Sequence, residues 1–266
     1  AQSDQPFVSD DGRFGLTFNG EIYNYIELRD ELVAKGQSFR TKSDTEVLLR
    51  ALMTWGEDAL PKLNGMFAFT FWDTLEKTLL VARDRFGEKP LYYYADPAYG
   101  FAAASEMKAL LADRRIPDEV DPHSVEAYQI GQYYEDTEPT FFAAIRRVLP
   151  AHFMRVSAKG EITDIKRYWT PDYEDIDHAM TCDEAVDGFG ARLEEAVRKR
   201  LRSDVTVGSS LSGGMDSSAI VAHIAKLRKD SGSTAPQNTF SARFDSDPTM
   251  SEGPFIDSVV AYTGVA

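Results

Sequence analysis

The sequence predicts an α+β domain followed by the beginning of an α/β domain. Four short runs rich in Phe, Tyr, Val and Leu lie between residues 66 and 103, separated by turn residues, which favours an antiparallel, layered sheet with helices packed on it. An acidic, weakly patterned segment follows at residues 171–183. Beyond it, helices and strands alternate, which is typical of a parallel sheet covered on both faces. We therefore expect domains at residues 1–170 and 184–266, joined by a linker at 171–183.

Composition excludes several classes of protein. The 266 residues are 43% hydrophobic and 27% charged, the profile of a soluble globular protein with a substantial core. The formal net charge of -14 argues against a nucleic-acid partner, which would call for a basic surface. No apolar run approaches the roughly 18 residues of a membrane span, and the polar start of the chain does not resemble a signal peptide. We therefore expect a cytoplasmic protein with no membrane partner. Cys182 is the only cysteine, which excludes an intramolecular disulfide and a cysteine-based zinc site.

The expected elements of the first domain start with a strand at residues 13–18, which ends at Asn19-Gly20, and a helix at 25–35. Ser43 and Glu46 have the spacing of a capping box and predict a second helix over residues 45–54. The core-facing positions expected in the two helices are Ile26, Leu28, Leu32 and Val33, then Val47, Leu48, Leu49, Leu52 and Met53. The strands expected after them are 66–72, 78–83, 91–95, 99–103, about 152–156 and 161–168.

The second domain is expected to begin with an amphipathic helix at residues 184–201. Its predicted inner face is Ala185, Val186, Phe189, Leu193, Val197 and Leu201. The later elements are a strand at 205–211, a helix at 217–228, a strand at 238–244 and a helix at 251–262. Two strands are too few for an independent parallel sheet, and there is no initiator Met. We therefore interpret the chain as an internal fragment of a longer protein.

The segment at residues 212–218, Ser-Gly-Gly-Met-Asp-Ser-Ser, joins the predicted strand to the predicted helix. Glycines let the backbone turn tightly and let an anion approach, and the free N–H groups at a helix start attract that anion. Hydroxyl donors come from Ser212, Ser217 and Ser218. Asp216 would repel phosphate on its own, so it predicts Mg²⁺ between carboxylate and phosphate. A bare Gly-Gly often serves only as a turn, and a Walker-type loop would need a Lys that is missing here. We predict a loop that holds the pyrophosphate of ATP.

The dipeptide Asn19-Gly20 has two interpretations. A side-chain amide next to a glycine N–H can form an oxyanion hole, with two donors aimed at one carbonyl oxygen. Asn-Gly is also a common turn dipeptide, and taken alone that second interpretation is the stronger one.

Both regions carry a resemblance to known families. The loop at 212–218, preceded by Ser203-Asp204-Val205 and Val207-Gly208, resembles the ATP-pyrophosphatase superfamily and, within it, the glutamine-hydrolysing asparagine synthetases. The first domain resembles the class II glutamine amidotransferases. The matching segments occur in the expected order at residues 19–24, 43–46, 64–69, 82–93 and 104–110. Together these segments span nearly the whole chain.

This resemblance implies a fold and a set of site residues. The fold would be an N-terminal-nucleophile αββα amidotransferase sandwich, incomplete here, followed by the start of an adenine-nucleotide α-hydrolase-like parallel-sheet domain. Asn19 and Gly20 would bind glutamine and stabilise the oxyanion, while Glu21 and Asp44 would hold the α-ammonium group. The implied ATP and pyrophosphate residues are Leu211, Ser212, Gly213, Gly214, Asp216, Ser217, Ser218 and Ala242, with Asp216 as the Mg²⁺ ligand. The segment at 83–89 would form a structural charge network of Arg83, Asp84, Arg85 and Lys89, and the aromatic side chains of Phe67, Phe69, Phe71 and Trp72 would pack in the core.

The implied reaction is an ATP-dependent amide ligation that makes asparagine. Ammonia released from glutamine would attack a β-aspartyl-adenylate, so the partners would be glutamine, aspartate and ATP, with ATP and Mg²⁺ as cofactors. The family's nucleophile is an N-terminal cysteine; residue 1 here is Ala, so we expect this fragment alone to be inactive as a glutaminase. A same-fold synthetase with another acceptor amine, of the β-lactam synthetase or lasso-peptide cyclase type, and a non-catalytic relative stay open. So does a homodimer.

Overall fold

The computed structural model describes residues 4–131, 137–232, 237–243 and 251–265. Within these ranges the chain forms two compact units, residues 1–173 and 174–266. Each unit has its own hydrophobic core and is described by itself. No helix in the described ranges is long and apolar enough to cross a bilayer.

The first unit is built on a six-stranded antiparallel sheet in the order β1-β2-β3-β4-β8-β9. Its strands are β1 (Phe7–Val8), β2 (Phe14–Ile22), β3 (Gly65–Asp73), β4 (Thr78–Arg83), β8 (His152–Ser157) and β9 (Ile162–Arg167). The long central pair β2–β3 is in register from Phe14 opposite Asp73 to Ile22 opposite Gly65. The predicted strands from 66–72 to 161–168 are confirmed within one residue, because their aromatic and β-branched residues favour a pleated, half-buried surface.

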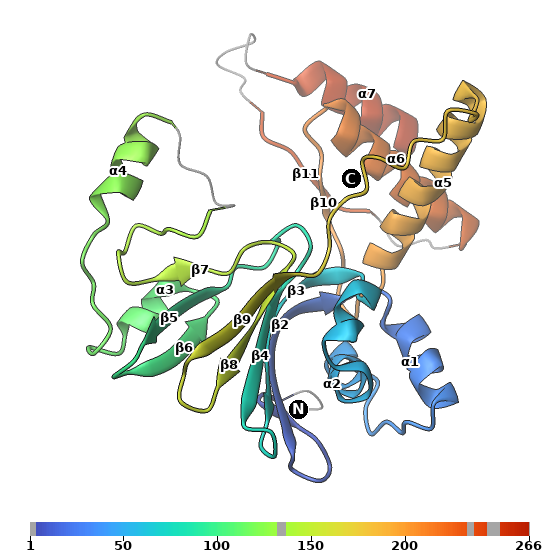
Figure 1. The fold of residues 1–266 in the computed structure, drawn as a ribbon. Coiled ribbons are helices and arrows are strands. Elements are labelled where there is room, and N and C mark those ends of the chain that lie inside the picture. Colours follow the sequence, from blue (N-terminus) through green and yellow to red (C-terminus); the bar gives the residue numbers. More distant parts are fainter. Residues whose placement is uncertain (1–3, 132–136, 233–236, 244–250, 266) are drawn as a thin grey trace. The chain divides into compact units, whose positions relative to one another are not determined.

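Helices α1 (Tyr25–Ala34) and α2 (Asp44–Trp55) lie beside this sheet, as Figure 1 shows in blue and cyan, and a 3₁₀ turn (Gly56–Lys62) follows α2. Their buried residues share one core with the inner residues of β2 and β3. Both helices were predicted, but the expected inner face of α1 is only half right. Leu28 and Leu32 are buried, whereas Ile26 is 42% and Val33 55% exposed. A ten-residue helix at the edge of the layer contacts the core along one narrow stripe.

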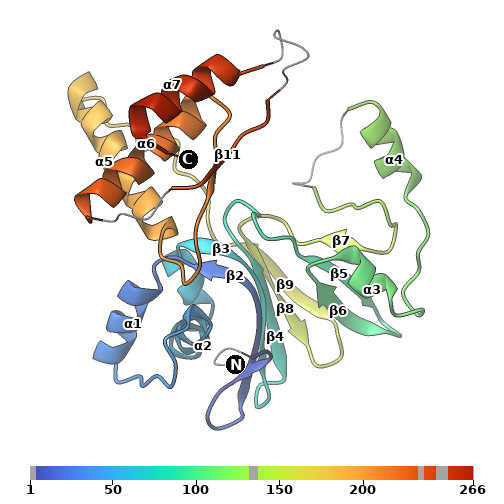
Figure 2. The same ribbon diagram turned by 180° about the vertical axis from the view of Figure 1, so that it is seen from behind.

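A second sheet, in the order β6-β5-β7, lies against the other face of the first. Its strands are β5 (Tyr92–Asp96), β6 (Gly100–Ala104) and β7 (Arg146–Arg147). Between the two sheets, Val81 and Met154 of the first sheet pack with Tyr93 of β5 and with Leu91, which precedes β5. On its far side the second sheet packs against α3 (Met107–Leu111), and α4 (Pro122–Gln129) follows in the chain. The resulting layers are helix, sheet, sheet and helix (Figures 1 and 2).

The second unit contains three helices and a short parallel ladder. The helices are α5 (Cys182–Arg200), α6 (Met215–Asp230) and α7 (Gly253–Thr263), and the strands are β10 (Ser209–Ser210) and β11 (Thr239–Phe240). Leu211, Val221, Ile256 and Val265 form its core. The alternation of helices with parallel strands agrees with the sequence prediction in type, though the extents of the elements differ.

Three predicted elements of this unit are wrong in length or orientation. Both strands shrink to two residues, from 205–211 and from 238–244, of which Phe244 lies outside the described residues. Helix α5 starts at residue 182, where Thr181 supplies a complete capping box with Glu184. Its predicted inner face is exposed in the first half of the helix, where Val186 is 63% and Phe189 68% accessible, whereas Leu193 and Leu201 are half-buried and Val197 is buried. Among the described residues, the sheet of this unit has only two short strands. It is too small to cover the apolar side chains of α5 or to pair with the rest of the predicted strands.

Candidate functional sites

The Asn19-Gly20 dipeptide lies inside a strand, which corrects the sequence prediction. Strand β2 continues through both residues to Ile22, with Asn19 opposite Ala68 and Gly20 opposite Phe67 on β3. The turn comes only afterwards, before α1 begins at Tyr25. Pairing with β3 therefore overrides the local turn preference of Asn-Gly.

Gly20 is required by the close approach of β2 to β3. A Cβ on Gly20 would lie 2.1 Å from the main-chain oxygen of Met66, and its φ is +155°. The same crowding holds across the pair, where a Cβ on Gly65 would lie 2.2 Å from the oxygen of Glu21. Only glycine fits at such contacts. The glycine beside Asn19 is thus explained by packing.

The Asn19 side chain faces the space between the two sheets. It is exposed, and its Nδ2 donates to Oγ of Ser105, just beyond the end of β6, over 3.0 Å. A cavity of about 230 Å³ lies beside it, lined by residues of β2, β3 and β6 and by Leu91. Along β2 the exposed Thr17, Asn19 and Glu21 alternate with residues that are buried or, at Gly20, half-buried, so Asn19 and Glu21 project from the same face of the strand.

Asp44 lies where β2 ends. It is the first residue of α2, and its Oδ2 accepts the main-chain N–H of Ile22 over 3.0 Å. Burial raises the pKa of Asp44 above its usual value. The structure therefore brings Asp44 next to the strand that carries Asn19, Gly20 and Glu21.

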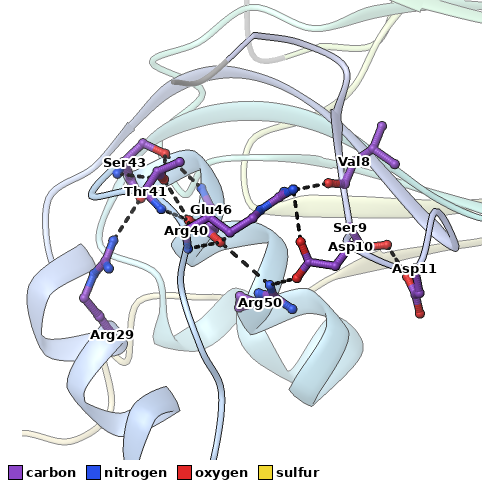
Figure 3. Close-up of polar contacts among 10 residues, drawn as sticks. All are labelled: Val8, Ser9, Asp10, Asp11, Arg29, Arg40, Thr41, Ser43, Glu46 and Arg50. Carbon is purple, nitrogen blue, oxygen red and sulfur yellow. Dashed lines mark hydrogen bonds and ion pairs between the residues drawn. The ribbon is translucent and has the colours of Figure 1, made fainter. Parts of the chain in front are cut away.

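A buried carboxylate fixes the segment that leads into Asp44 (Figure 3). Glu46 is 0% exposed, and its carboxylate accepts the main-chain N–H of Arg40 at 2.9 Å and that of Thr41 at 2.6 Å, together with the Thr41 hydroxyl at 2.7 Å. Arg50 lies 3.7 Å away and pairs with Asp10 at 2.6 Å. These bonds hold residues 40–43 in place ahead of α2.

The predicted capping box is only half formed. Ser43 Oγ accepts the N–H of Glu46 over 3.3 Å, as expected. The Glu46 side chain does not return to Ser43 but turns to residues 40 and 41. Residues 45–52 of α2 are all buried and Arg50 lies four positions after Glu46, so the Glu46 carboxylate must find its partners inside the protein.

The segment at 83–89 is structural, but its bonds differ from the predicted charge network. Asp84 is fully buried and accepts main-chain N–H groups from Phe67, Phe86, Glu88 and Lys89. Arg83 donates to the main-chain oxygens of Gly87, Lys89 and Val148. The partners of both side chains are main-chain groups, so these bonds satisfy backbone N–H and C=O groups of a tight loop. Of the four predicted core aromatics, Phe67, Phe69 and Phe71 are buried and Trp72 is half-buried.

In the second unit, the loop at 212–218 is held by its own serines. Ser212 and Ser217 hydroxyls lie 2.9 Å apart, and Ser217 Oγ accepts the main-chain N–H of Ser212 over 3.2 Å. Gly214 is the N-cap of α6, which starts two residues earlier than predicted. Gly213 has a φ of +84°, and a Cβ there would lie 2.9 Å from Cβ of Phe255. The loop thus places the N-terminus of a sixteen-residue helix beside two glycines.

The remaining residues of the loop region differ in accessibility. Ser218 Oγ is buried and has no hydrogen-bond partner among the described residues. Asp216, in the first turn of α6, is exposed, as is Ala242. Leu211 is buried; its N–H donates to the oxygen of Phe240 over 2.9 Å, and its own oxygen accepts from Ser241 over 2.7 Å. Both main-chain groups of Leu211 are therefore hydrogen-bonded to the segment that contains β11.

The described residues contain no group of three or more His, Cys, Asp or Glu side chains that could hold a metal ion. Mg²⁺ commonly takes one or two carboxylates and fills its other positions with water and substrate phosphate. Asp216 is a single exposed carboxylate at the start of α6, which suits a Mg²⁺ site of that kind and does not suit one built entirely from protein ligands.

Comparison with known proteins now gives the family. Residues 1–169 match the glutamine amidotransferase domain model, and residues 188–266 match that of asparagine synthase. The chain belongs to the glutamine amidotransferase domain family. It is a relative of the glutamine-hydrolysing asparagine synthetases, with the start of an asparagine synthase domain after the amidotransferase domain.

Individual relatives agree with this assignment. The chain is 36% identical over 262 residues to asparagine synthetase [glutamine-hydrolyzing] 3 of Bacillus subtilis, covering 94% of this chain and 41% of the relative. It is 40% identical over 217 residues to asparagine synthetase 1 of the same organism, covering 82% and 33%. It is also 33% identical over 271 residues to the amidase chyE of Penicillium rubens, covering 98% and 39%. The chain thus spans 33–41% of the length of these curated relatives.

A solved structure of glutamine phosphoribosylpyrophosphate amidotransferase from B. subtilis also aligns. The identity is 19% and the TM-score 0.43, over 89% of this chain and 48% of that one.

In the glutamine amidotransferase domain, Asn19, Gly20 and Glu21 lie on β2, and Asp44 is bonded to the end of that strand. In the second unit, residues 212–218 lie at the start of α6. The residues that sequence reasoning did not single out for a site are Ser105 and Glu46. Ser105 is bonded to a residue 86 positions earlier, which no local pattern reports, and Glu46 binds main-chain groups five and six positions before it in place of the predicted cap.

Proposed function

We propose that the protein containing this chain is an ATP-dependent amide ligase that makes asparagine from aspartate with ammonia taken from glutamine. The observation that carries the proposal is the placement of Asn19 and Gly20 on one strand beside an open cavity, with Asp44 bonded to the end of that strand. The glutaminase domain would occupy residues 1–170, the linker 171–183, and the start of the synthetase domain 184–266.

In the glutaminase half, the Asn19 amide and the Gly20 N–H would donate to the oxyanion that forms when glutamine is attacked. Glu21 and Asp44 would pair with the α-ammonium group, a cation that suits two carboxylates. The nucleophile is assigned by the resemblance to an N-terminal cysteine, which the 266 residues do not include. Cys182 is exposed at the start of α5 in the other unit and is not a candidate.

In the synthetase half, the loop at 212–218 would hold the pyrophosphate of ATP. The first N–H groups of α6 and the hydroxyls of Ser212, Ser217 and Ser218 supply donors for the anion. The buried and unpartnered Ser218 Oγ supports this, because such a group costs free energy until a ligand satisfies it. Bound Mg²⁺ would neutralise phosphate charge, with Asp216 as one ligand.

The chemistry then proceeds in two balanced steps. The β-carboxylate of aspartate attacks the α-phosphorus of ATP, which forms the acyl-adenylate and releases pyrophosphate. Ammonia attacks the acyl carbon, AMP leaves with the former carboxylate oxygen, and a proton is lost to give asparagine. Activation is needed because a carboxylate oxygen is a very poor leaving group until it is joined to phosphate.

Glutamine hydrolysis by the full-length protein tests the first half. Asn19→Ala should lower kcat by about 10²–10³-fold, the usual effect of removing one oxyanion donor. Asn238→Ala, an exposed asparagine of the second unit, is the matched control and should leave the rate unchanged. Equal effects of the two variants would contradict the assignment.

Exchange of labelled pyrophosphate into ATP tests the second half. With the full-length protein, exchange should require aspartate and Mg²⁺, and Ser217→Ala should weaken it. An enzyme that exchanges without aspartate but with another carboxylate would instead support the same-fold synthetase with a different acceptor. The similarity to chyE over 98% of the chain is the observation that favours this second candidate.

A further inference from the structure

One hydrogen bond joins the candidate oxyanion amide to the second sheet. Asn19 Nδ2, on β2 of the first sheet, donates to Oγ of Ser105, which lies 86 positions later and follows β6 of the second sheet. Ser105 is half-buried, whereas Asn19 is exposed on its strand. Among the described residues, this is the hydrogen bond that fixes the Asn19 carboxamide.

The two atoms suit a positioning role. A carboxamide nitrogen carries two N–H groups, so a bond to a hydroxyl uses one and leaves the other to donate elsewhere. An exposed Asn on a strand would otherwise rotate about its side-chain torsions, and its amide would sample several orientations. Anchoring one N–H fixes the plane of the amide, and therefore the direction of the second N–H, before substrate arrives.

The other polar side chains beside the cavity are already paired. Gln5 Nε2 donates to the oxygen of Phe18 over 2.7 Å, and its Oε1 accepts the N–H of Phe18 over 2.6 Å. The hydroxyls of Thr17 and Thr70 lie 2.7 Å apart. Gln5 is thus held against the main chain of Phe18 and the two threonines against each other, whereas Asn19 is held by Ser105 across the cavity.

We propose that Ser105 is the positioning residue of the glutaminase site, holding the Asn19 amide so that its second N–H meets the developing oxyanion. This inference rests on the proposed glutaminase function and adds a residue to it. Ser105 acts through Asn19, so its loss should reduce stabilisation of the transition state and leave binding of ground-state glutamine unchanged.

The test is the steady-state kinetics of glutamine hydrolysis by the full-length protein. Ser105→Ala should lower kcat about tenfold with KM unchanged, less than the full loss of a donor because the amide is misaligned and not removed. Ser105→Thr and Ser105→Val introduce side chains of nearly equal shape, of which only threonine carries a hydroxyl. The Thr variant should keep kcat within about twofold of wild type, and the Val variant should lose about tenfold.

Ser157→Ala is the matched control. Ser157 is half-buried like Ser105, and its Oγ accepts the N–H groups of Lys159 and Glu161, each at 3.2 Å, in the turn after β8. This turn packs at Gly100, the opposite end of β6 from Ser105. Its loss should leave kcat and KM as in wild type.

A double-mutant cycle separates positioning from a general structural effect. In an Asn19→Ala background, Ser105→Ala should cause no further fall in kcat, because the group that it positions is gone. Independent effects that multiply would overturn the proposal, as would equal kcat in the Thr and Val variants. If wild type hydrolyses glutamine and Ser105→Ala leaves kcat unchanged, only this inference fails. If wild type hydrolyses none, the proposed function fails with it.

Discussion

The two candidate sites are held in different ways. Asn19 and Gly20 lie in a nine-residue strand that pairs along its whole length with β3, and their partners are about fifty positions away. The loop at 212–218 lies between a two-residue strand and α6, and its bonds join residues no more than five positions apart. One site is positioned by sheet register, the other by local contacts.

This difference separates the consequences of a substitution. A substitution that disturbs β2 also moves the backbone of β3, and both strands contribute to one hydrophobic core. Stability and the geometry of the site are therefore lost together. A change in the locally bonded loop can be absorbed by the loop itself and by the start of α6. We expect the first site to respond chiefly in folding and the second chiefly in ligand binding.

The largest expected effect comes from Gly20→Ala. The new Cβ would lie 2.1 Å from the Met66 oxygen, and both atoms belong to paired backbones that cannot give way cheaply. The free energy of unfolding should fall by at least about 3 kcal/mol. Gly213→Ala, with φ +84° and the Phe255 Cβ at 2.9 Å, should cost about 1–3 kcal/mol. Urea denaturation gives the free energies, and amide hydrogen exchange assigns each loss to its unit.

Gly190→Ala is the control for both glycines. A Cβ at Gly190 would meet nothing within 4 Å, and the residue lies inside α5. The Gly190→Ala substitution should therefore stabilise the protein by about 0.5–1 kcal/mol through helix propensity alone. A Gly20→Ala variant as stable as the Gly190→Ala variant would break the comparison.

The next effect concerns Glu46, the buried carboxylate ahead of α2. Glu46→Gln replaces a charged acceptor of several short bonds with a neutral amide whose NH₂ cannot accept them. The free energy of unfolding should fall by about 2 kcal/mol. Glu31→Gln offers the matched exposed case, because Glu31 pairs with Lys62 at 3.1 Å with both side chains about 40% accessible. It should cost under about 1 kcal/mol, and equal losses would refute the role of Glu46.

Sequence patterns predicted the first unit better than the second. The strands at 66–72 and 78–83 were found because aromatic and β-branched residues gather there and neighbouring strands exist to pair with them. The run at 205–211 has a similar pattern, yet only Ser209–Ser210 form a ladder, with β11 alone beside it among the described residues. A strand pattern becomes a strand only where partners supply its hydrogen bonds.

The site residues divide along the same line. Asn19, Gly20 and the loop at 212–218 could be picked out because their local chemistry resembles known motifs. The position of Asn19 within a strand could not be predicted from the sequence, because Asn-Gly is locally a turn signal and only its pairing with β3 overrides that preference. Ser105 escaped notice because its partner lies on another sheet, and a contact between distant segments leaves no periodic trace in the sequence.

The smallest expected change in stability sharpens the comparison most. Burial raises the pKa of Asp44, so the folded state holds its proton to a higher pH than the unfolded state does. Stability is therefore lost as pH rises from the ordinary carboxyl value through the raised pKa, and the loss persists at neutral pH. Asp44→Asn removes the charge and keeps an oxygen that can accept the Ile22 N–H. It should raise the free energy of unfolding at pH 7 by up to about 1 kcal/mol and flatten this pH dependence.

The same substitution at the other site should act with the opposite sign. Both carboxylates lie in the first turn of a helix, where a negative charge interacts favourably with the helix dipole, but at Asp44 the cost of burial outweighs this. Asp216 is exposed, so Asp216→Asn should cost a few tenths of a kcal/mol. Thermal unfolding between pH 4 and pH 8 measures both variants, and glutamine kinetics of the full-length protein supply the second readout. A more stable Asp44→Asn protein with a higher KM for glutamine would mean that the charge is kept at a cost in folding because the ammonium group needs it. If Asp44→Asn were less stable than wild type at pH 7, the carboxylate would instead be a structural acceptor, and its assignment to glutamine would have to be withdrawn.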